Sequence, residues 1–222
     1  MILERFVVGR LQANCYVVGD EDTREVLIVD PGDHGEAIVA EMAQREYRVV
    51  AVFVTHSHLD HSGAAAEVLE ALPEASFWMH EVDHAAIALQ APSAASWYGH
   101  AVSVPRPPDR LLAHGDTLAV GALQFTALHT PGHTPGSICV AGEGVVFTGD
   151  VLFQGSIGRF DFPGSDGNAL IRSIRAHLLT LPPETAVLPG HGEQTTIDVE
   201  ARQNPFLAAT RQMLGFDPDD DD

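Results

Sequence analysis

An apolar run followed at once by a histidine-rich segment constrains this chain more than any other feature. Residues 49–54 read Val-Val-Ala-Val-Phe-Val, residues 55–61 read Thr-His-Ser-His-Leu-Asp-His, and residues 63–69 are again mostly apolar. The first run has the length and the β-branched content of a buried strand, and the last is typical of a helix. The sequence therefore predicts a strand, a turn with metal-binding side chains, and a helix.

The histidine-rich turn has the donor groups of a metal site. In an extended or turning segment, His56 and His58 project to the same side and can share one ion. Asp60 and His61 open the following helix and can face a second ion. Nitrogen and oxygen donors suit zinc, iron or manganese better than a soft-metal site. The alternative is a solvated polar turn, but so many donors on so short a segment favour metal binding.

Three later segments repeat the arrangement of a short apolar run that ends at a Gly or Pro turn with a His or an Asp. The runs and the donors that follow them are 123–128 with His133, 145–148 with Asp150, and 185–188 with His191. Loops just beyond strand ends are where α/β proteins assemble their sites. Four strand ends that deliver donors to one edge would complete a site for two metals.

The order of these donors resembles the metallo-β-lactamase superfamily over nearly the whole length of the chain. The matching positions are His56, His58, Asp60, His61, His133, Asp150 and His191. Five segments resemble its glyoxalase II-related branch: 132–136, 149–153, 158–164, 189–192 and 204–206. The resemblance implies an α/β fold, the αββα sandwich of two mixed sheets with outer helices, and a metal site at one edge between the sheets.

The resemblance also implies which metal each donor binds. The first metal would be held by His56, His58 and His133, the second by Asp60, His61 and His191, and Asp150 would bridge the two. We expect two divalent ions, zinc first, with iron or manganese as alternatives. Asp150 stands where one group of true β-lactamases has a cysteine, and His58 stands where the oxygen-reducing flavodiiron proteins have a glutamate. Both groups are therefore disfavoured.

The function that the resemblance implies is hydrolysis of a small thioester by a hydroxyacylglutathione hydrolase-like enzyme. A hydroxide between the metals would attack the thioester carbonyl, with Asp60 and Asp150 as the catalytic carboxylates. Arg159 is either a surface arginine or the anchor of a substrate carboxylate, and we favour the anchor because arginine binds carboxylates bidentately. Glyoxalase II enzymes carry basic glutathione contacts in an extra C-terminal helical region. Arg211 is the only basic residue after Phe206 here, so we expect weak glutathione recognition or another thiol.

Two other functions remain open. Persulfide dioxygenases of a related branch use one iron held by two histidines and an aspartate, which would match His56, His133 and Asp150, and they carry a segment like Gly158–Phe162. Residues 189–192 look more like the hydrolase form. The other possibility is a non-catalytic metal-binding or scaffold protein, which is disfavoured because no ligand is missing.

Composition sets further limits on the class of protein. We expect one domain over residues 1–216 and an acidic, disordered tail over 217–222, for which metal sequestration is a less favoured role. The formal net charge is −19, which disfavours binding to nucleic acid. The sequence shows no signal peptide and no run long enough to cross a membrane, so we expect a cytoplasmic protein with a small-molecule substrate. Cys15 and Cys139 are expected to be buried and unpaired.

Two residues near the predicted site need separate interpretation. Asp30 ends an apolar strand, so it either forms the turn or orients a ligand imidazole. His129 precedes His133 by four residues, but only His133 has the neighbours that the family shows. We therefore exclude His129 as a ligand.

The periodicity predicts strands and helices in alternation. The expected strands are 2–8, 14–19, 25–30, 49–55, 76–79, 117–128, 137–141, 144–148 and 185–188. The expected helices are 35–46, 62–72, 81–90, 167–180 and 197–213. The proline-rich residues 105–109 predict a rigid connection between the two halves of the sandwich.

Overall fold

The computed structural model describes residues 1–208, except for the side chain of Trp97. The tail predicted at 217–222 lies outside the described residues, as does the end of the helix expected at 197–213. No helix among the described residues is both long and apolar enough to cross a membrane.

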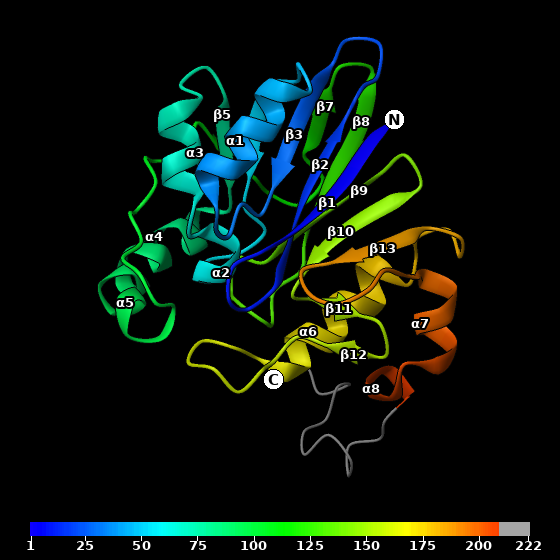
Figure 1. Ribbon diagram of the computed structural model, residues 1–222. Coiled ribbons are helices and arrows are strands. Elements are labelled where there is room, and N and C mark those ends of the chain that lie inside the picture. The colour runs from blue at the N-terminus through cyan, green and yellow to red at the C-terminus, as the bar shows by residue number, and fades with distance from the viewer. Residues whose placement is uncertain (209–222) are drawn as a thin grey trace.

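Two six-stranded sheets form the centre of the molecule (Figure 1). The strands of the first sheet, in spatial order, are β1 (Ile2–Val8), β2 (Ala13–Gly19), β3 (Glu25–Val29), β4 (Arg48–Phe53), β5 (Ser76–Met79) and β6 (Arg110–Leu111). Those of the second are β14 (Thr195–Thr196), β13 (Ala186–Pro189), β10 (Val145–Gly149), β9 (Ile138–Gly142), β8 (Leu123–His129) and β7 (Thr117–Val120). Strands β11 (Leu152–Phe153) and β12 (Ser156–Ile157) form a separate hairpin. Both large sheets contain parallel and antiparallel pairs.

Helices cover the outer faces of both sheets. The helical segments are α1 (Gly35–Gln44), α2 (Leu59–Ser62), α3 (Ala65–Ala71), α4 (Glu81–Gln90), a 3-10 turn (Ala91–Ser93), α5 (Ala94–Trp97), α6 (Gly167–Ser173) with a π-helical extension (Ile174–Leu178), α7 (Ile197–Gln203) and α8 (Pro205–Ala208). Figure 1 shows α1 and α3 beside the first sheet, and α6 and α7 beside the second.

The burial pattern of the strands explains why the two sheets lie between two outer layers of helices. Along β2, Tyr16 and Val18 pack in the cluster between the two sheets, whereas Cys15 and Val17 pack in the cluster beneath α1 and α3. A third cluster joins the outer face of the second sheet to α6. Because successive side chains of a strand point to opposite faces, apolar runs such as β2 are buried on both sides. The predicted αββα sandwich is confirmed.

Turns and helix breaks divide three of the predicted elements. The strand expected at 117–128 is a hairpin of β7 and β8, because Gly121 has a φ of 59° in a tight turn. The helix expected at 62–72 starts earlier and is split into α2 and α3. The helix expected at 197–213 breaks after α7, where Asn204 is extended before Pro205.

The connection between the sheets also differs from its prediction. Residues 105–109 precede β6, which is still part of the first sheet, so the chain crosses to the second sheet between β6 and β7. The carboxyl ends of β4, β8, β10 and β13 reach one edge of the sandwich, as the recurrent strand-end donors predicted. This edge therefore holds the candidate site.

Candidate metal centre

Three groups of side chains at this edge bring donor atoms within 4.8 Å of one another. The groups are His56 with His58 and His133, His56 with His61 and Asp150, and Asp60 with His61 and His191. Together they contain all seven donors named from the sequence. The loops that follow β4, β8, β10 and β13 supply five of them, and helix α2 supplies Asp60 and His61.

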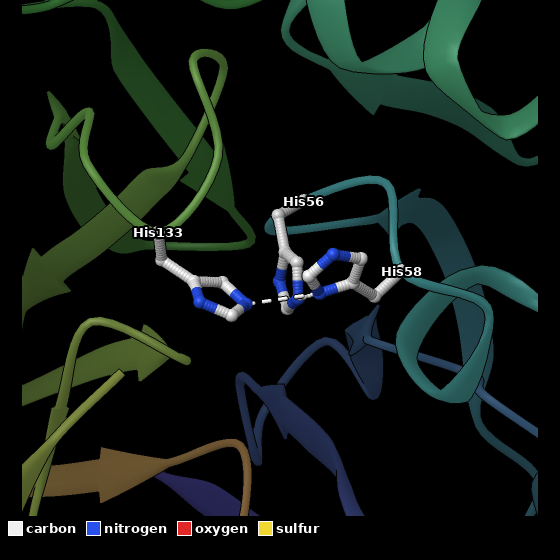
Figure 2. A group of neighbouring side chains, drawn as sticks. All are labelled: His56, His58 and His133. Carbon is white, nitrogen blue, oxygen red and sulfur yellow. Dashed lines mark hydrogen bonds between the residues drawn. The ribbon is translucent and has the colours of Figure 1, made fainter. Parts of the chain in front are cut away.

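In the first group, three imidazole nitrogens point at one another (Figure 2). Nδ1 of His58 lies 3.2 Å from Nε2 of His56 and 2.9 Å from Nε2 of His133. The other ring nitrogen of His133 donates to the carbonyl oxygen of Arg159 at 2.8 Å. Because a neutral imidazole carries one proton, this bond leaves Nε2 of His133 with a lone pair.

The same reasoning assigns the tautomer of His56. Its Nδ1 lies 3.0 Å from Oγ1 of Thr55, and that hydroxyl donates its only proton to Asp30 at 2.7 Å. Nδ1 of His56 is therefore the donor in this pair, and Nε2 carries a lone pair. The lone pairs of His56 and His133 therefore both face Nδ1 of His58, which can satisfy only one of them with a proton, so a cation among the three nitrogens would use both.

Burial keeps these rings in the protonation state that binds metals. Desolvation, helped by the neighbouring histidines, holds the pKa of His56 well below its usual range. Burial and His133 lower the pKa of His58 to about 4. Both rings are therefore neutral near pH 7, as metal ligation requires.

The third group, Asp60 with His61 and His191, combines imidazoles with a carboxylate. Nε2 of His191 lies 3.3 Å from Nε2 of His61 and 3.2 Å from Oδ2 of Asp60. Burial alone would lower the pKa of His61, but the charges of Asp150 and Asp60 raise it well above its usual range. This half of the site therefore attracts positive charge.

Asp150, which belongs to the second group, lies between the first group and the third. Its Oδ2 is 3.6 Å from Nε2 of His133, while its Oδ1 is 3.2 Å from Nε2 of His61. The carboxylate is desolvated, but the surrounding histidines hold its pKa well below its usual range. Oδ1 is buried and, despite the nearby imidazole, makes no bond of hydrogen-bond geometry. An ionised, buried oxygen without a hydrogen bond is a ligand atom for a cation.

The donor set fits divalent metal ions. Lone pairs of the histidines and ionised carboxylates converge on the same space, and nitrogen with oxygen donors suits zinc, iron or manganese. Asp150 presents one oxygen to each side of this space. The individual ligand roles stay predictions, and the geometry brings together every residue that they require.

Asp30 contacts a histidine of the site, as one of its two interpretations requires. Its Oδ2 accepts a hydrogen bond from Nδ1 of His61 at 2.9 Å, and its Oδ1 accepts one from the backbone N–H of Thr55 at 2.7 Å. Its own φ is 52°, so it also forms the turn after β3. Asp30 therefore fixes the orientation of His61.

Asp83 of α4 is a functional residue that the sequence did not indicate. Its buried carboxylate accepts hydrogen bonds from the backbone N–H of Ser57 at 2.8 Å, the hydroxyl of Thr134 at 2.7 Å and the backbone N–H of Gly136 at 2.8 Å. It thereby joins the loop of His56 and His58 to the loop of His133. In the sequence it looks like an ordinary acidic residue in the first turn of a helix.

The loop of His191 is held against the first sheet. The side-chain amide of Asn14 donates to the carbonyl oxygens of Pro189 and Gly192, and the hydroxyl of Tyr16 donates to that of Pro189. At Gly190, a Cβ atom would overlap Oδ1 of Asp150. Asn14 and Tyr16 carry no motif, so their role follows only from the packing of the two sheets.

His129 lies apart from the donor groups, as predicted. Its Nε2 donates to the carbonyl oxygen of Pro135 at 2.9 Å, and its ring stacks on His80 with 4.6 Å between centroids. It belongs to none of the three groups of donors among the described residues. Cys15 and Cys139 are buried and unpaired, as expected.

A cavity of about 1090 Å³ opens beside the donors. His58, His133, Asp60, Asp150 and His191 line its inner end, and α4 and the loop at 156–164 line its sides. Arg159 lies at this cavity too, but its Nε and Nη2 donate to Asp161 at 2.9 Å each, and its guanidinium covers the ring of Phe162 at 4.1 Å.

Comparison with solved structures shows the same architecture. The structure of BLEG-1 B3 metallo-β-lactamase superposes with a TM-score of 0.85 at 36% identity, covering 94% of this chain and 100% of that one. TTHA1623 in a di-iron-bound form gives 0.82 at 40% identity, covering 92% and 100%. ETHE1 from Myxococcus xanthus gives 0.79 at 30% identity, covering 96% and 87%.

Sequence comparison gives the family. The hydroxyacylglutathione hydrolase GloC of Haemophilus influenzae is 38% identical over 210 residues, which covers 93% of this chain and 98% of that protein. The family model of the metallo-β-lactamase superfamily matches residues 8–191, a range that contains all seven donors. This chain therefore belongs to the metallo-β-lactamase superfamily.

Proposed function

We propose that this protein is a dinuclear metallohydrolase that cleaves a small thioester. The observation that carries the proposal is the position of Asp150, whose two oxygens face His133 on one side and His61 on the other. A bridging carboxylate between two complete donor groups is what a two-metal site needs. The likeness to GloC, whose name states thioester chemistry on hydroxyacylglutathione, supports this class of reaction.

The side chains of the site have separate roles in this proposal. Two bound metal ions, zinc first, would supply an activated water near neutral pH and polarise the carbonyl of the substrate. Asp60 is only partly exposed and lines the cavity, so it can orient the attacking water. Because a thiolate is a good leaving group, the reaction needs no dedicated general acid. The likeness to TTHA1623, which holds two irons, supports a dinuclear site and keeps iron as an alternative metal.

Arg159 is the proposed anchor for a substrate carboxylate at the mouth of the cavity. Its guanidinium is bonded in a fork to Asp161 and stacks on Phe162, so its position is set before a substrate arrives. A substrate carboxylate would have to share the guanidinium with Asp161 or replace it. The substrate is a small molecule rather than a nucleic acid, because a chain with a net charge of −19 repels phosphate backbones.

The second candidate is a mononuclear iron persulfide dioxygenase. The close grouping of His56 and Asp150 with His133 favours it, because two histidines and one carboxylate are the ligands of this kind of iron site. The hydrolase is preferred because Asp60, His61 and His191 form a second group that one iron would leave without a metal.

One assay panel separates these reactions. Protein purified without added metal and then loaded with zinc, iron or manganese would be given a thioester, a persulfide and a β-lactam, with release of thiol, uptake of oxygen and opening of the lactam ring measured in parallel. We expect thiol release alone. Oxygen uptake with the persulfide and no thiol release would contradict the hydrolase, and lactam opening alone would place the protein with enzymes of the kind that BLEG-1 is named for.

A further inference from the structure

We propose that the side walls of the cavity bind hydrocarbon, so that the substrate is a thioester with an extended apolar group and at most one carboxylate. This inference rests on the thioester hydrolysis proposed above and adds the chemical class of the substrate. The support for it comes from the apolar lining, the charges and the volume of the cavity, and not from the metal ligands at its inner end.

Exposed apolar side chains gather around this cavity. Val82 and Leu89 of α4 are 50% and 83% exposed, Leu11 is 44% exposed, and Phe162 is 37% exposed, and all four line it. Single exposed apolar residues are common on protein surfaces, whereas a group around one cavity marks a place where apolar groups bind.

The apolar walls continue to the donors themselves. The ring of Phe162 lies 5.3 Å from the ring of His58, and the ring of Phe153 lies 6.4 Å from the ring of His191. Both phenylalanines line the cavity. A hydrocarbon group against these rings therefore lies next to a carbonyl that reacts at the inner end.

The charges of the cavity disfavour a substrate with several carboxylates. Among the described residues that line it, Arg159 is the only lysine or arginine, and this guanidinium already bonds to Asp161. The acidic residues that line the cavity are Asp60, Asp83 and Asp150. One cation at the mouth can serve one substrate carboxylate, and among the described lining residues no second lysine or arginine is present to serve another.

The volume of the cavity suits an extended group. Small-molecule sites commonly enclose about 300–1000 Å³, and this one measures about 1090 Å³. A short hydroxyacyl group would leave most of the walls without contact. The apolar faces of α4 and of the loop at 156–164 would then remain in water.

Two matched series of thioesters test the inference on the metal-loaded, full-length protein. One series keeps the thiol and lengthens the acyl chain, and the other keeps the acyl group and lengthens the thiol. We expect kcat/KM to rise about threefold for each added methylene over the first few in at least one series, because each buried methylene leaves water. Thioesters of equal length that end in two carboxylates should lose this gain. A flat response in both series would overturn the inference.

A pair of variants links the gain to the wall. Val82→Asp places a charge in the first turn of α4. Val199→Asp, the matched control, places one in the first turn of α7. In both helices the backbone N–H of the valine donates to the side chain of the N-cap residue. Val82→Asp should reduce the preference for the longest thioester over the shortest by about tenfold or more, and Val199→Asp should not change it. Equal preferences in both variants would overturn the assignment of the wall.

Uncleavable thioethers of the same lengths separate failure of this inference from failure of the proposed function. Calorimetry should show tighter binding with length and a negative heat-capacity change. If no thioester is cleaved but this trend is present, the reaction is wrong and the apolar wall stands. If thioesters are cleaved without any dependence on length, the reaction stands and the apolar wall is wrong.

Discussion

The inner end and the mouth of the cavity are built in different ways. The donors at the inner end, which we call the floor, are His58, Asp60, His133, Asp150 and His191, which line the cavity, with His56 and His61 grouped with them. His56, His61 and His133 are buried and the other four are half-buried, and hydrogen bonds to Asp30 and to the carbonyl oxygen of Arg159 fix His61 and His133. The rim consists of Leu11, Val82, Leu89, Arg159 and Phe162, and its apolar members are 37–83% exposed.

This difference separates chemistry from specificity. A reaction that depends on metal ions needs donors held in one geometry, and a rigid floor supplies it. Contacts of the rim act on the substrate alone, so changes there should alter which substrates react and leave the metals in place. The variants below test this separation, from the floor to the rim and then to a histidine outside both.

The largest effect is expected from Asp150→Ala. Because one carboxylate is proposed to contact both ions, its loss should lower metal occupancy on both sides and reduce kcat/KM by more than about a thousandfold. Elemental analysis of the variant next to its thioesterase rate measures both. Full occupancy with normal activity would remove Asp150 from the floor.

A smaller loss is expected from Asp83→Asn. The amide group has nearly the same shape, but its NH2 must face a donor, either the N–H of Ser57 or that of Gly136. The two ligand loops should therefore separate, and metal affinity should fall by about 10- to 100-fold.

The matched control for that variant is Asp20→Asn. Asp20 also accepts bonds from the backbone N–H groups of two segments, at Asp22 and Ala122, and it lies outside the donor groups. Both variants should lose stability, and only Asp83→Asn should lose metal affinity in a competition with a chelator. Equal metal affinities would show that Asp83 supports folding alone.

At the rim, Arg159→Ala should change substrate binding only. The side chain is 63% exposed and already shares its guanidinium with Asp161, so we expect KM for a carboxylate-bearing thioester to rise about tenfold. Metal content should not change, and kcat should fall less than KM rises. Arg159→Lys should recover part of the loss because it lacks the planar fork. An unchanged KM would show that Arg159 stabilises its own loop and does not bind the substrate.

The smallest effect is expected from His129→Ala. The variant removes a hydrogen bond to the carbonyl oxygen of Pro135 and a stacking contact with His80, which lie outside the floor. Metal content and thioesterase activity should equal those of the unchanged protein. If His129→Ala released a metal while His133→Ala did not, the assignment of the floor would be wrong.

The sequence predicted the floor better than its supports, for a physical reason. His56, His58, Asp60 and His61 share one turn, so their spacing is visible locally, and His133, Asp150 and His191 each follow an apolar run that ends at a glycine or proline turn. Asp83 carries no such signal, because its partners Ser57 and Gly136 are brought to it only by the packing of α4 against two loops.

The fold was predictable where apolar periodicity is strong. Strand β1 and helix α4 match their predicted bounds, whereas the short strands β6, β11, β12 and β14 were missed. Each of these has two residues, and a pair of residues has no period to detect. The hairpin at Gly121 and the break before Pro205 depend on local turn geometry, which interrupts a pattern without changing its composition.

The number of metal ions bound per chain tests the account most directly. Protein purified without added metal and then titrated with zinc should bind two ions per chain, and thioesterase activity should rise with the ions bound. Removal of both ions with a chelator should abolish the activity, and zinc should restore it. One iron per chain, together with oxygen uptake on a persulfide, would contradict the dinuclear hydrolase.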